Sequence, residues 1–181
     1  MIPVLVALAI IGILLFVIIA GQPDEFTILR SAKISAPPEN VFAQVNDFHK
    51  WEAWSPWAKL DPNAKNTFEG PPAGTGAGFA WAGNNKVGEG RMTLTESRPN
   101  DYIRINLEFL KPFKAVNTTE FTFKPDGEKT TLTWTMSGKN NFMAKAFGLF
   151  VDCDKMVGGQ FEQGLANMKA IVESPAAARV H

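Results

Sequence analysis

Three charged side chains in otherwise apolar patterns are the first candidates for chemistry. Arg30 falls on the apolar side of one alternating segment, and Asp154 lies at the edge of the apolar face of a long predicted helix. Glu96 shares the parity of Met92 and Leu94. An ionisable group that faces an apolar cavity is desolvated, which shifts its pKa and can suit it to acid or base catalysis. An ion pair at a cavity rim or, for Asp154, a favourable charge in a first helical turn are simpler roles.

The sequence contains few residues that could support nucleophilic catalysis or bind a metal. The histidines are His49 and His181, and no G-x-S-x-G motif is present. His49 lies beside Asp47 and near Ser55, but a triad gathered from one short loop would be unusual, so we expect a surface or loop residue. Cys153 is the only cysteine, which excludes an intrachain disulfide and a cysteine-based zinc cluster. We predict no metal and no cofactor, and we name no catalytic residue.

The composition fits one globular domain once the N-terminus is set aside. The chain has 181 residues, of which 45% are hydrophobic and 20% charged. Eighteen basic residues balance eighteen acidic residues, and no basic run or aromatic-basic interleaving stands out. Nucleic acid is therefore not an expected partner.

The N-terminus has the features of a membrane anchor. No charged residue occurs from Ile2 to Ala20, and this span is close to the ~20 residues that cross a bilayer as a helix. A cleaved signal peptide is the alternative. However, no Lys or Arg precedes the apolar run, the run exceeds the usual ~7–15 apolar residues, and Ile18 would stand where a small residue is preferred. We predict a retained single-pass anchor over residues 1–21.

The segment after the anchor is a joint over residues 22–27, too short to act as a free linker, so the following domain is expected to sit against the bilayer surface. Arg30 and Lys33 follow the apolar run, whereas only the chain amine precedes it. By the positive-inside rule this favours a cytoplasmic domain.

A long helix and an antiparallel sheet are expected to position the candidate residues. The helix is predicted from Phe150 to Glu173, because apolar residues recur on one face at about 100° per residue. That face comprises Phe150, Cys153, Val157, Phe161, Leu165, Met168, Ile171 and Val172. Gly158, Gly159 and Gly164 each cost about 1 kcal/mol in a helix relative to Ala, so we expect them to allow close approach to the sheet or leave room for a ligand.

Alternation of apolar and polar residues predicts the strands. Segments with this pattern are 26–34, the stretch with Phe79 and Trp81, 87–97, 102–110, the stretch with Phe121 and Phe123, and 131–137. A helix is expected after Pro37-Pro38 to about Asn46, and a short one from about Phe48. The Gly-rich loop from Gly70 to Gly78 leads into a strand and lacks the G-x-G-x-x-G spacing, so it does not indicate a phosphate site.

Three blocks of sequence resemble a known superfamily. They are RSAKISAPPENVFAQVNDFHKWEAWSPW, GPPAGTGAGFAWAGN and DKMVGGQFEQGLANMK. These residues are similar to the polyketide-cyclase-like branch of the START/SRPBCC helix-grip superfamily, and the resemblance covers Ile28 to Glu173. It implies an α+β fold in which a curved antiparallel sheet of about seven strands wraps a long C-terminal helix around an apolar cavity. It does not imply one activity, because members bind lipids, sterols, polyketides or hormones and only some are catalytic.

Together these observations predict a START-like domain over residues 28–173 that is tethered to the membrane and binds a hydrophobic small molecule or lipid between sheet and helix. The candidate ligand-binding residues are Arg30, Trp54, Trp81, Met92, Leu94, Ile105, Phe121, Trp134, Asp154 and Phe161. If the ligand carries a carbonyl or anionic group, Arg30 is the first candidate to bind it. The tail from 174 to 181 is expected to be disordered.

Two alternatives remain open. The first is a cyclase- or dehydratase-like enzyme that acts through Arg30, Glu96 or Asp154. The second is a scaffold with a filled core, in which the cluster of Trp51, Trp54 and Trp57 binds another protein.

Overall fold

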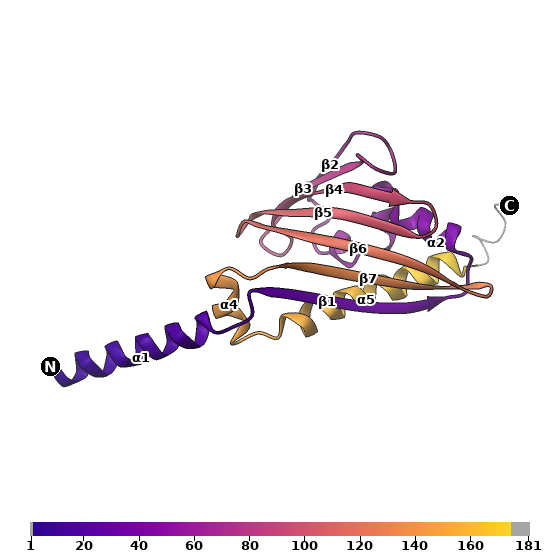
Figure 1. The fold of residues 1–181 in the computed structure, drawn as a ribbon. Coiled ribbons are helices and arrows are strands. Elements are labelled where there is room, and N and C mark those ends of the chain that lie inside the picture. The colour runs from indigo at the N-terminus through magenta and orange to yellow at the C-terminus, as the bar shows by residue number, and fades with distance from the viewer. Residues whose placement is uncertain (1, 175–181) are drawn as a thin grey trace.

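The computed structural model describes residues 2–174. Apart from Ser174, the predicted disordered tail therefore lies outside the described residues. The N-terminal half contains α1 (Ile2–Ala20), β1 (Glu25–Ile34), α2 (Pro38–Val45), the 3-10 turn η1 (Phe48–Lys50), α3 (Trp51–Trp54), the 3-10 turn η2 (Pro56–Lys59), β2 (Lys65–Glu69) and β3 (Gly78–Ala82). The C-terminal half contains β4 (Glu89–Arg98), β5 (Tyr102–Lys111), β6 (Ala115–Asp126), β7 (Lys129–Lys139), α4 (Phe142–Gly148) and α5 (Cys153–Val172) (Figure 1).

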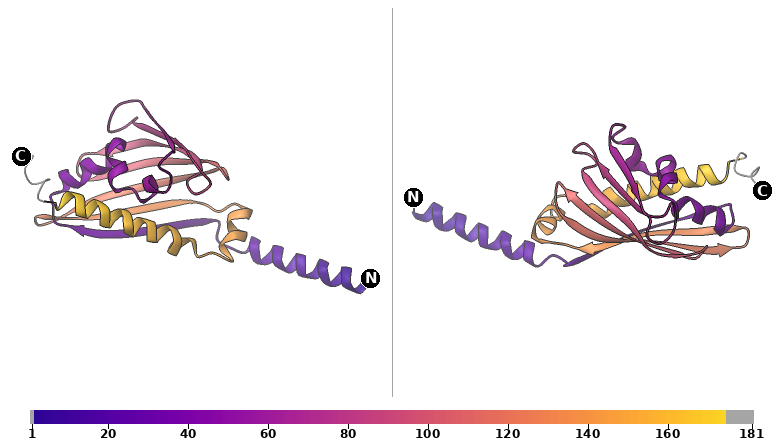
Figure 2. Two further views of the ribbon diagram at one scale, coloured as in Figure 1. Left: turned by 180° about the vertical axis from the view of Figure 1, so that it is seen from behind. Right: turned by 90° about the horizontal axis from the view of Figure 1, so that it is seen from above.

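The strands form one antiparallel seven-stranded sheet in the order β1-β7-β6-β5-β4-β3-β2. The first strand therefore pairs with the last, and the remaining strands follow as successive hairpins. Figure 2 shows that α5 and the shorter helices cover one face of the curved sheet, whereas the other face is left uncovered. This is the expected α+β helix-grip architecture, and the prediction of the fold is confirmed.

The inner face of the sheet and the apolar face of α5 form the core. Alternate residues of β6 and β7 are buried, as the period of a half-buried strand requires. On α5 the buried residues are Gly158, Phe161, Gly164, Leu165, Met168 and Val172. The ring of Phe161 stacks on the indole of Trp134 with 4.1 Å between ring centroids and an interplanar angle of 7°. This contact joins the helix to the centre of the sheet.

Two of the three helical glycines allow the close approach of α5 to the sheet. A Cβ on Gly158 would lie 2.1 Å from Nη2 of Arg30, and one on Gly164 would lie 2.9 Å from Cζ3 of Trp134. A Cβ on Gly159 would meet nothing within 4 Å. At Gly158 and Gly164 the space is therefore occupied by protein side chains. The close packing that these glycines allow offsets their low helix propensity.

The main differences from the predicted elements concern the start of α5 and the strand β2. Helix α5 begins at Cys153, where Asp152 caps it by accepting a 2.9 Å hydrogen bond from the Lys155 backbone N–H. Phe150 is therefore outside the helix and is 85% exposed, so its expected place on the buried stripe is wrong. Strand β2 was not predicted from the sequence. All of its residues are exposed, so they show no alternation of apolar and polar side chains.

Substitution of the helical glycines tests the packing of α5. Gly164→Ala is expected to lower the free energy of unfolding by about 1 kcal/mol or more, because overpacking against Trp134 and Pro56 exceeds the gain in helix propensity. Gly159→Ala is the matched control and should raise the free energy of unfolding by about 0.5–1 kcal/mol. Thermal unfolding of the full chain in a non-ionic detergent, followed by circular dichroism, measures both. Equal effects at the two positions would contradict the packing described here.

Candidate functional site

The centre of the space between sheet and helix is filled by side chains. Trp54, Leu94, Ile105, Phe121, Trp134 and Phe161 are each at most 2% exposed, and Met92 is 9% exposed. The rings contact one another: Trp134 lies 4.9 Å from Phe121 and 5.6 Å from Trp54 between centroids. Trp81 is half-buried at the sheet's β3 side, where its indole N–H donates to the Val87 carbonyl at 3.0 Å. These candidate residues are thus brought together, but as a packed core.

One donor in this core has no acceptor. The indole Nε1 of Trp134 is buried and makes no hydrogen bond with any residue that the structure describes. A buried N–H without a partner costs about 1–3 kcal/mol. The nearby indoles of Trp51 and Trp54, in contrast, donate to the carbonyls of Val45 and Gln44. The interior therefore contains one polar group whose hydrogen bond is unmade.

Arg30 joins β1 to α5. Its Nε donates to Glu162 at 2.7 Å, and its Nη2 donates to the carboxylate of Asp154 at 2.8 Å. The remaining bonds go to the second oxygen of Asp154 and to the carbonyls of Leu29 and Asp154. Every nitrogen of the guanidinium is thus engaged, which leaves no donor for a ligand. The structure favours the ion-pair interpretation of Arg30 and Asp154 over a headgroup-binding one.

Glu96 lies on the opposite face from the one expected. Strand β4 carries a register shift between Leu94 and Glu96, so that one extra residue is inserted opposite β5. Beyond this bulge the parity reverses: Ser97 points inward and its hydroxyl donates to the Asn46 side chain at 2.7 Å. Glu96 lies 3.7 Å from the exposed Arg104 on the outer face. The prediction that Glu96 faces the interior is wrong.

The outer face near Glu96 holds a network of charged and aromatic groups. The guanidinium of Arg98 lies 4.5 Å from the centre of the Tyr102 ring, and the Tyr102 hydroxyl bonds to Glu120. Burial, together with the bond to the Glu120 carboxylate, raises the pKa of Tyr102 to about 12. A shallow hollow of about 350 Å³ lies beside it, lined by Thr93, Thr95, Arg104, Ile105, Asn106 and Thr118. Five of these six lining residues have polar or charged side chains, so it suits an apolar ligand less well than a hollow walled by aromatic rings and prolines would.

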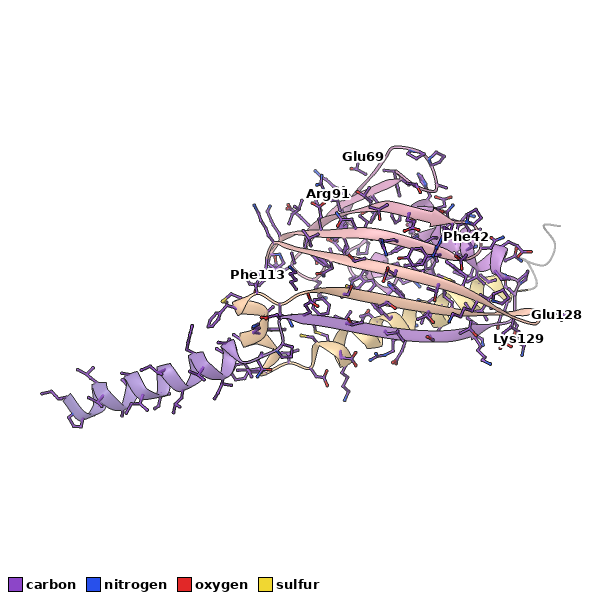
Figure 3. The ribbon with its side chains drawn as sticks, viewed as in Figure 1. Phe42, Glu69, Arg91, Phe113, Glu128 and Lys129 are labelled. Carbon is purple, nitrogen blue, oxygen red and sulfur yellow. The ribbon has the colours of Figure 1, made fainter. Side chains whose placement is uncertain are left out.

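A second hollow, of about 270 Å³, lies at the β2 edge of the sheet and is mainly apolar. It is lined by Phe48, His49, Phe68, Glu69, Gly70, Pro71, Pro72, Ala77 and Gly78. Figure 3 shows Glu69 at this edge of the sheet. The walls come from η1, from β2 and from the loop that leads into β3. Phe68 packs on Phe79, which in turn packs on Phe48, so the hollow adjoins the aromatic core.

His49 and Glu69 are the polar side chains that line this hollow, and Asp47 fixes the orientation of His49. Asp47 caps η1 by accepting a hydrogen bond from the His49 backbone N–H at 2.9 Å. The same carboxylate oxygen lies 2.8 Å from Nδ1 of the imidazole. The imidazole stacks on Phe68 with 4.0 Å between centroids. With Nδ1 held by Asp47, Nε2 is the nitrogen that remains to bond a ligand.

His49 was expected to be a surface or loop residue, and Phe68, Pro71 and Pro72 were not among the predicted ligand-binding residues. The spacing of Asp47 and His49 could have indicated an oriented imidazole. A carboxylate at a helix N-cap can reach both the backbone N–H and the side chain of the residue two positions later. The hydrophobic residue Phe68 stands among polar residues in β2, which gave no recognisable alternation. Its contact with His49 depends on a pairing of distant segments that the sequence pattern does not specify.

Comparison with known proteins adds a family match. The family described as "Polyketide cyclase / dehydrase and lipid transport" matches residues 25–173 of this chain. No curated protein matches the chain.

Solved structures resemble this fold. Protein CV1439 from Chromobacterium violaceum is similar with a TM-score of 0.59 and 18% identity, over 84% of this chain and 99% of that one. Protein MLL2253 from Mesorhizobium loti has a TM-score of 0.59 and 21% identity, over 82% and 100%. CalU16 from Micromonospora echinospora has a TM-score of 0.55 and 16% identity, over 84% and 80%. At these identities the likeness concerns the fold alone.

The bond between Arg30 and Asp154 predicts a pH-dependent contribution to stability. Hydrogen bonding to Arg30 holds the pKa of Asp154 below its ordinary 3.8. The folded carboxyl thus releases its proton more readily than the unfolded one, so the contribution is complete above the ordinary pKa and is lost as the pH falls through the folded pKa. Asp154→Asn should lower the melting temperature slightly at neutral pH, because the Asp154 side chain is largely exposed and solvent screens the pair.

Melting temperatures of the wild type and Asp154→Asn, measured from neutral pH to well below 3.8, should converge at the acidic end. Glu128→Gln, at the exposed tip of the β6–β7 hairpin, provides a control that should follow the wild type throughout. A difference that persists unchanged in acid would show that the effect of Asp154→Asn does not come from the ion pair.

Proposed function

Because the chain belongs to the family of polyketide cyclases, dehydrases and lipid-transport proteins, we propose that it is a membrane-tethered module that binds a small apolar molecule. The ligand occupies the hollow lined by Phe48, His49 and Phe68, which we call the edge hollow. The observation that carries this proposal is the hollow's combination of apolar walls with one oriented imidazole. Apolar pockets with a few placed polar groups are typical small-molecule sites.

The size of the edge hollow limits the ligand. Its volume of about 270 Å³ lies just below the range of about 300–1,000 Å³ that is common for ligand pockets. It corresponds to roughly nine molecules of liquid water, so it is more than a packing defect. A ring system or a short hydrocarbon chain fits such a volume, whereas a lipid with two acyl chains would extend outside it.

His49 is expected to select the ligand's polar group. Since Asp47 holds Nδ1, a carbonyl, hydroxyl or carboxyl of the ligand can bond Nε2. The ring of Phe68 against the imidazole restricts the rotation of both side chains. The ligand is therefore apolar with one hydrogen-bonding group, rather than a pure hydrocarbon.

Helix α1 is the proposed tether. An 18-residue window of this 19-residue helix has a mean hydropathy of 3.3, and the window is almost entirely exposed, which in water would be unfavourable. Among the described residues it is the one helix long and apolar enough to cross a bilayer. Arg30 and Lys33 follow it within about one strand length, so by the positive-inside rule we place the domain on the cytoplasmic side.

The interior around Trp134 is a second possible location for the same ligand. The unpaired Nε1 of Trp134 would gain an acceptor if a ligand carbonyl entered the core. Entry there requires the stacked Trp134 and Phe161 to separate. An enzyme that uses Arg30, Glu96 or Asp154 gains no support, because Arg30 is paired with Asp154 and Glu162, and Glu96 lies beside Arg104 on the outer face.

Native mass spectrometry of the purified full chain tests the proposal. We expect the wild type to carry a small apolar molecule that co-purifies with it. Ala77→Leu, which adds bulk to a buried wall of the edge hollow, should abolish this adduct. Gly164→Ala, which adds a methyl group in the interior beside Trp134, should retain it. Circular dichroism of both variants confirms that they are folded.

Affinity provides a second measurement once the adduct is identified. Phe68→Ala removes an exposed wall of the edge hollow and should weaken binding by about tenfold. Loss of the adduct in Gly164→Ala but not in Ala77→Leu would place the ligand in the interior. If no adduct is found and a panel of lipids and small apolar molecules produces no thermal shift, the chain is not a binding module.

A further inference from the structure

The end of the domain next to α1 exposes large apolar side chains. Phe113, at the tip of the β5–β6 hairpin, is 68% exposed, and Phe150, which follows α4, is 85% exposed. Phe142, Met143 and Phe147 on α4 are each about half exposed. We call these five residues the apolar end. Figure 3 places Phe113 at the end of the sheet from which α1 leaves, whereas Glu128 and Lys129 lie at the opposite end.

Helix α4 is attached directly to the C-terminal end of α1. The ring of Phe142 lies 5.6 Å from the ring of Phe16. Lys145 donates to the Ala20 carbonyl at 3.4 Å and to Asp24 at 2.5 Å, so it caps α1 with a positive charge. The Asn140 backbone N–H also donates to the Asp24 carbonyl at 2.8 Å. These contacts fix the position of the apolar end relative to α1.

The contact with Phe16 sets the depth of α4. With 19 residues, α1 is about as long as the ~30 Å hydrocarbon core, so Ala20 lies near the edge of that core. Phe16 is one turn earlier, about 6 Å inside it. Phe142 touches Phe16, so its ring reaches the boundary between acyl chains and headgroups. This is the depth to which apolar faces of interfacial helices insert.

Charged residues beside the apolar end suit the same environment. Lys111 and Lys114 flank the Phe113 tip, and Lys139 ends β7 just before α4. Lys114 and Lys139 are exposed. Lysines at this level can extend to lipid phosphates while neighbouring aromatic rings enter the interface. Asp24 is an acidic residue at this end of the domain. Hydrogen bonding to Lys145 lowers its pKa and thus keeps the carboxylate ionised and paired.

From these contacts we propose that the apolar end inserts into the headgroup region of the bilayer as a second membrane contact, separate from the transmembrane helix. This rests on the proposed role of α1 as a tether. The occupant is a lipid surface rather than a protein, because the apolar end lies on the side from which α1 leaves (Figures 1 and 2). A protein partner would have to enter between the domain and the membrane.

The depth of single spin labels tests this inference on the full chain. The protein carries Cys153→Ser and is reconstituted in nanodiscs of phosphatidylcholine with a minor fraction of phosphatidylglycerol. Nitroxide labels are attached singly through Phe113→Cys, Phe147→Cys, Glu128→Cys or Ile10→Cys. Accessibility to oxygen relative to a water-soluble nickel complex should be several-fold higher at positions 113 and 147 than at 128, and highest at position 10.

The labels separate failure of the inference from failure of the tether. If position 10 has a lipid-like ratio while 113 and 147 match 128, the tether stands and the second contact is overturned. If position 10 is also aqueous, both are overturned. Spin–spin broadening at 147 together with an aqueous ratio would assign the apolar end to a second copy and overturn lipid contact.

A double variant, Phe113→Asp and Phe147→Asp, provides an independent measurement. With a label at Phe150→Cys, it should reduce the oxygen-to-nickel ratio to the value at position 128. Leu29→Asp, on the exposed face of β1, is the control and should leave the ratio at position 150 unchanged. An unchanged ratio in the double variant would contradict insertion of these side chains.

Discussion

The stacking of Phe161 on Trp134 is the contact on which the arrangement of this domain depends. It brings α5 onto the centre of the sheet, and it is possible because Gly164 presents no side chain to the indole. The same contact decides where a guest molecule can lie. Aromatic rings from the sheet, from α3 and from α5 fill the centre, and the edge hollow lies outside it, at β2. Because the core is closely packed, the candidate site lies at the β2 edge of the sheet rather than between the sheet and α5.

Arg30 illustrates how one cation serves this packing. It lies opposite Trp134 in the β1–β7 ladder, and its guanidinium extends across Gly158 to two carboxylates of α5. A methyl group at position 158 would collide with it. The glycine and the arginine therefore form one unit that seats the first half of α5 on the edge strand, while Gly164 and Trp134 seat the second half.

Much of the fold follows from sequence periodicity, because long alternating strands and a helical stripe each bury one face. Alternation predicts the wrong face of a strand where the chain inserts an extra residue. The bulge near Thr95 turns Glu96 outward, and no residue type at that point marks the bulge in the sequence. Phe150 was misplaced because apolar character alone does not mark a helix start, which Asp152 provides. The edge hollow depends on β2, whose exposed residues carry no period. Contacts between distant segments, such as His49 with Phe68, are set by tertiary packing.

The direct passage from α1 into β1 has a mechanical consequence. Strand β1 runs away from α1 and is paired with β7 along its whole length, from Glu25 to Ile34. A pull on α1 along this direction loads the hydrogen bonds of the ladder in shear, so that many must break together rather than in succession. If α1 is the tether proposed above, bending or lateral tension in the bilayer would thus reach the sheet without unravelling the strand that receives it.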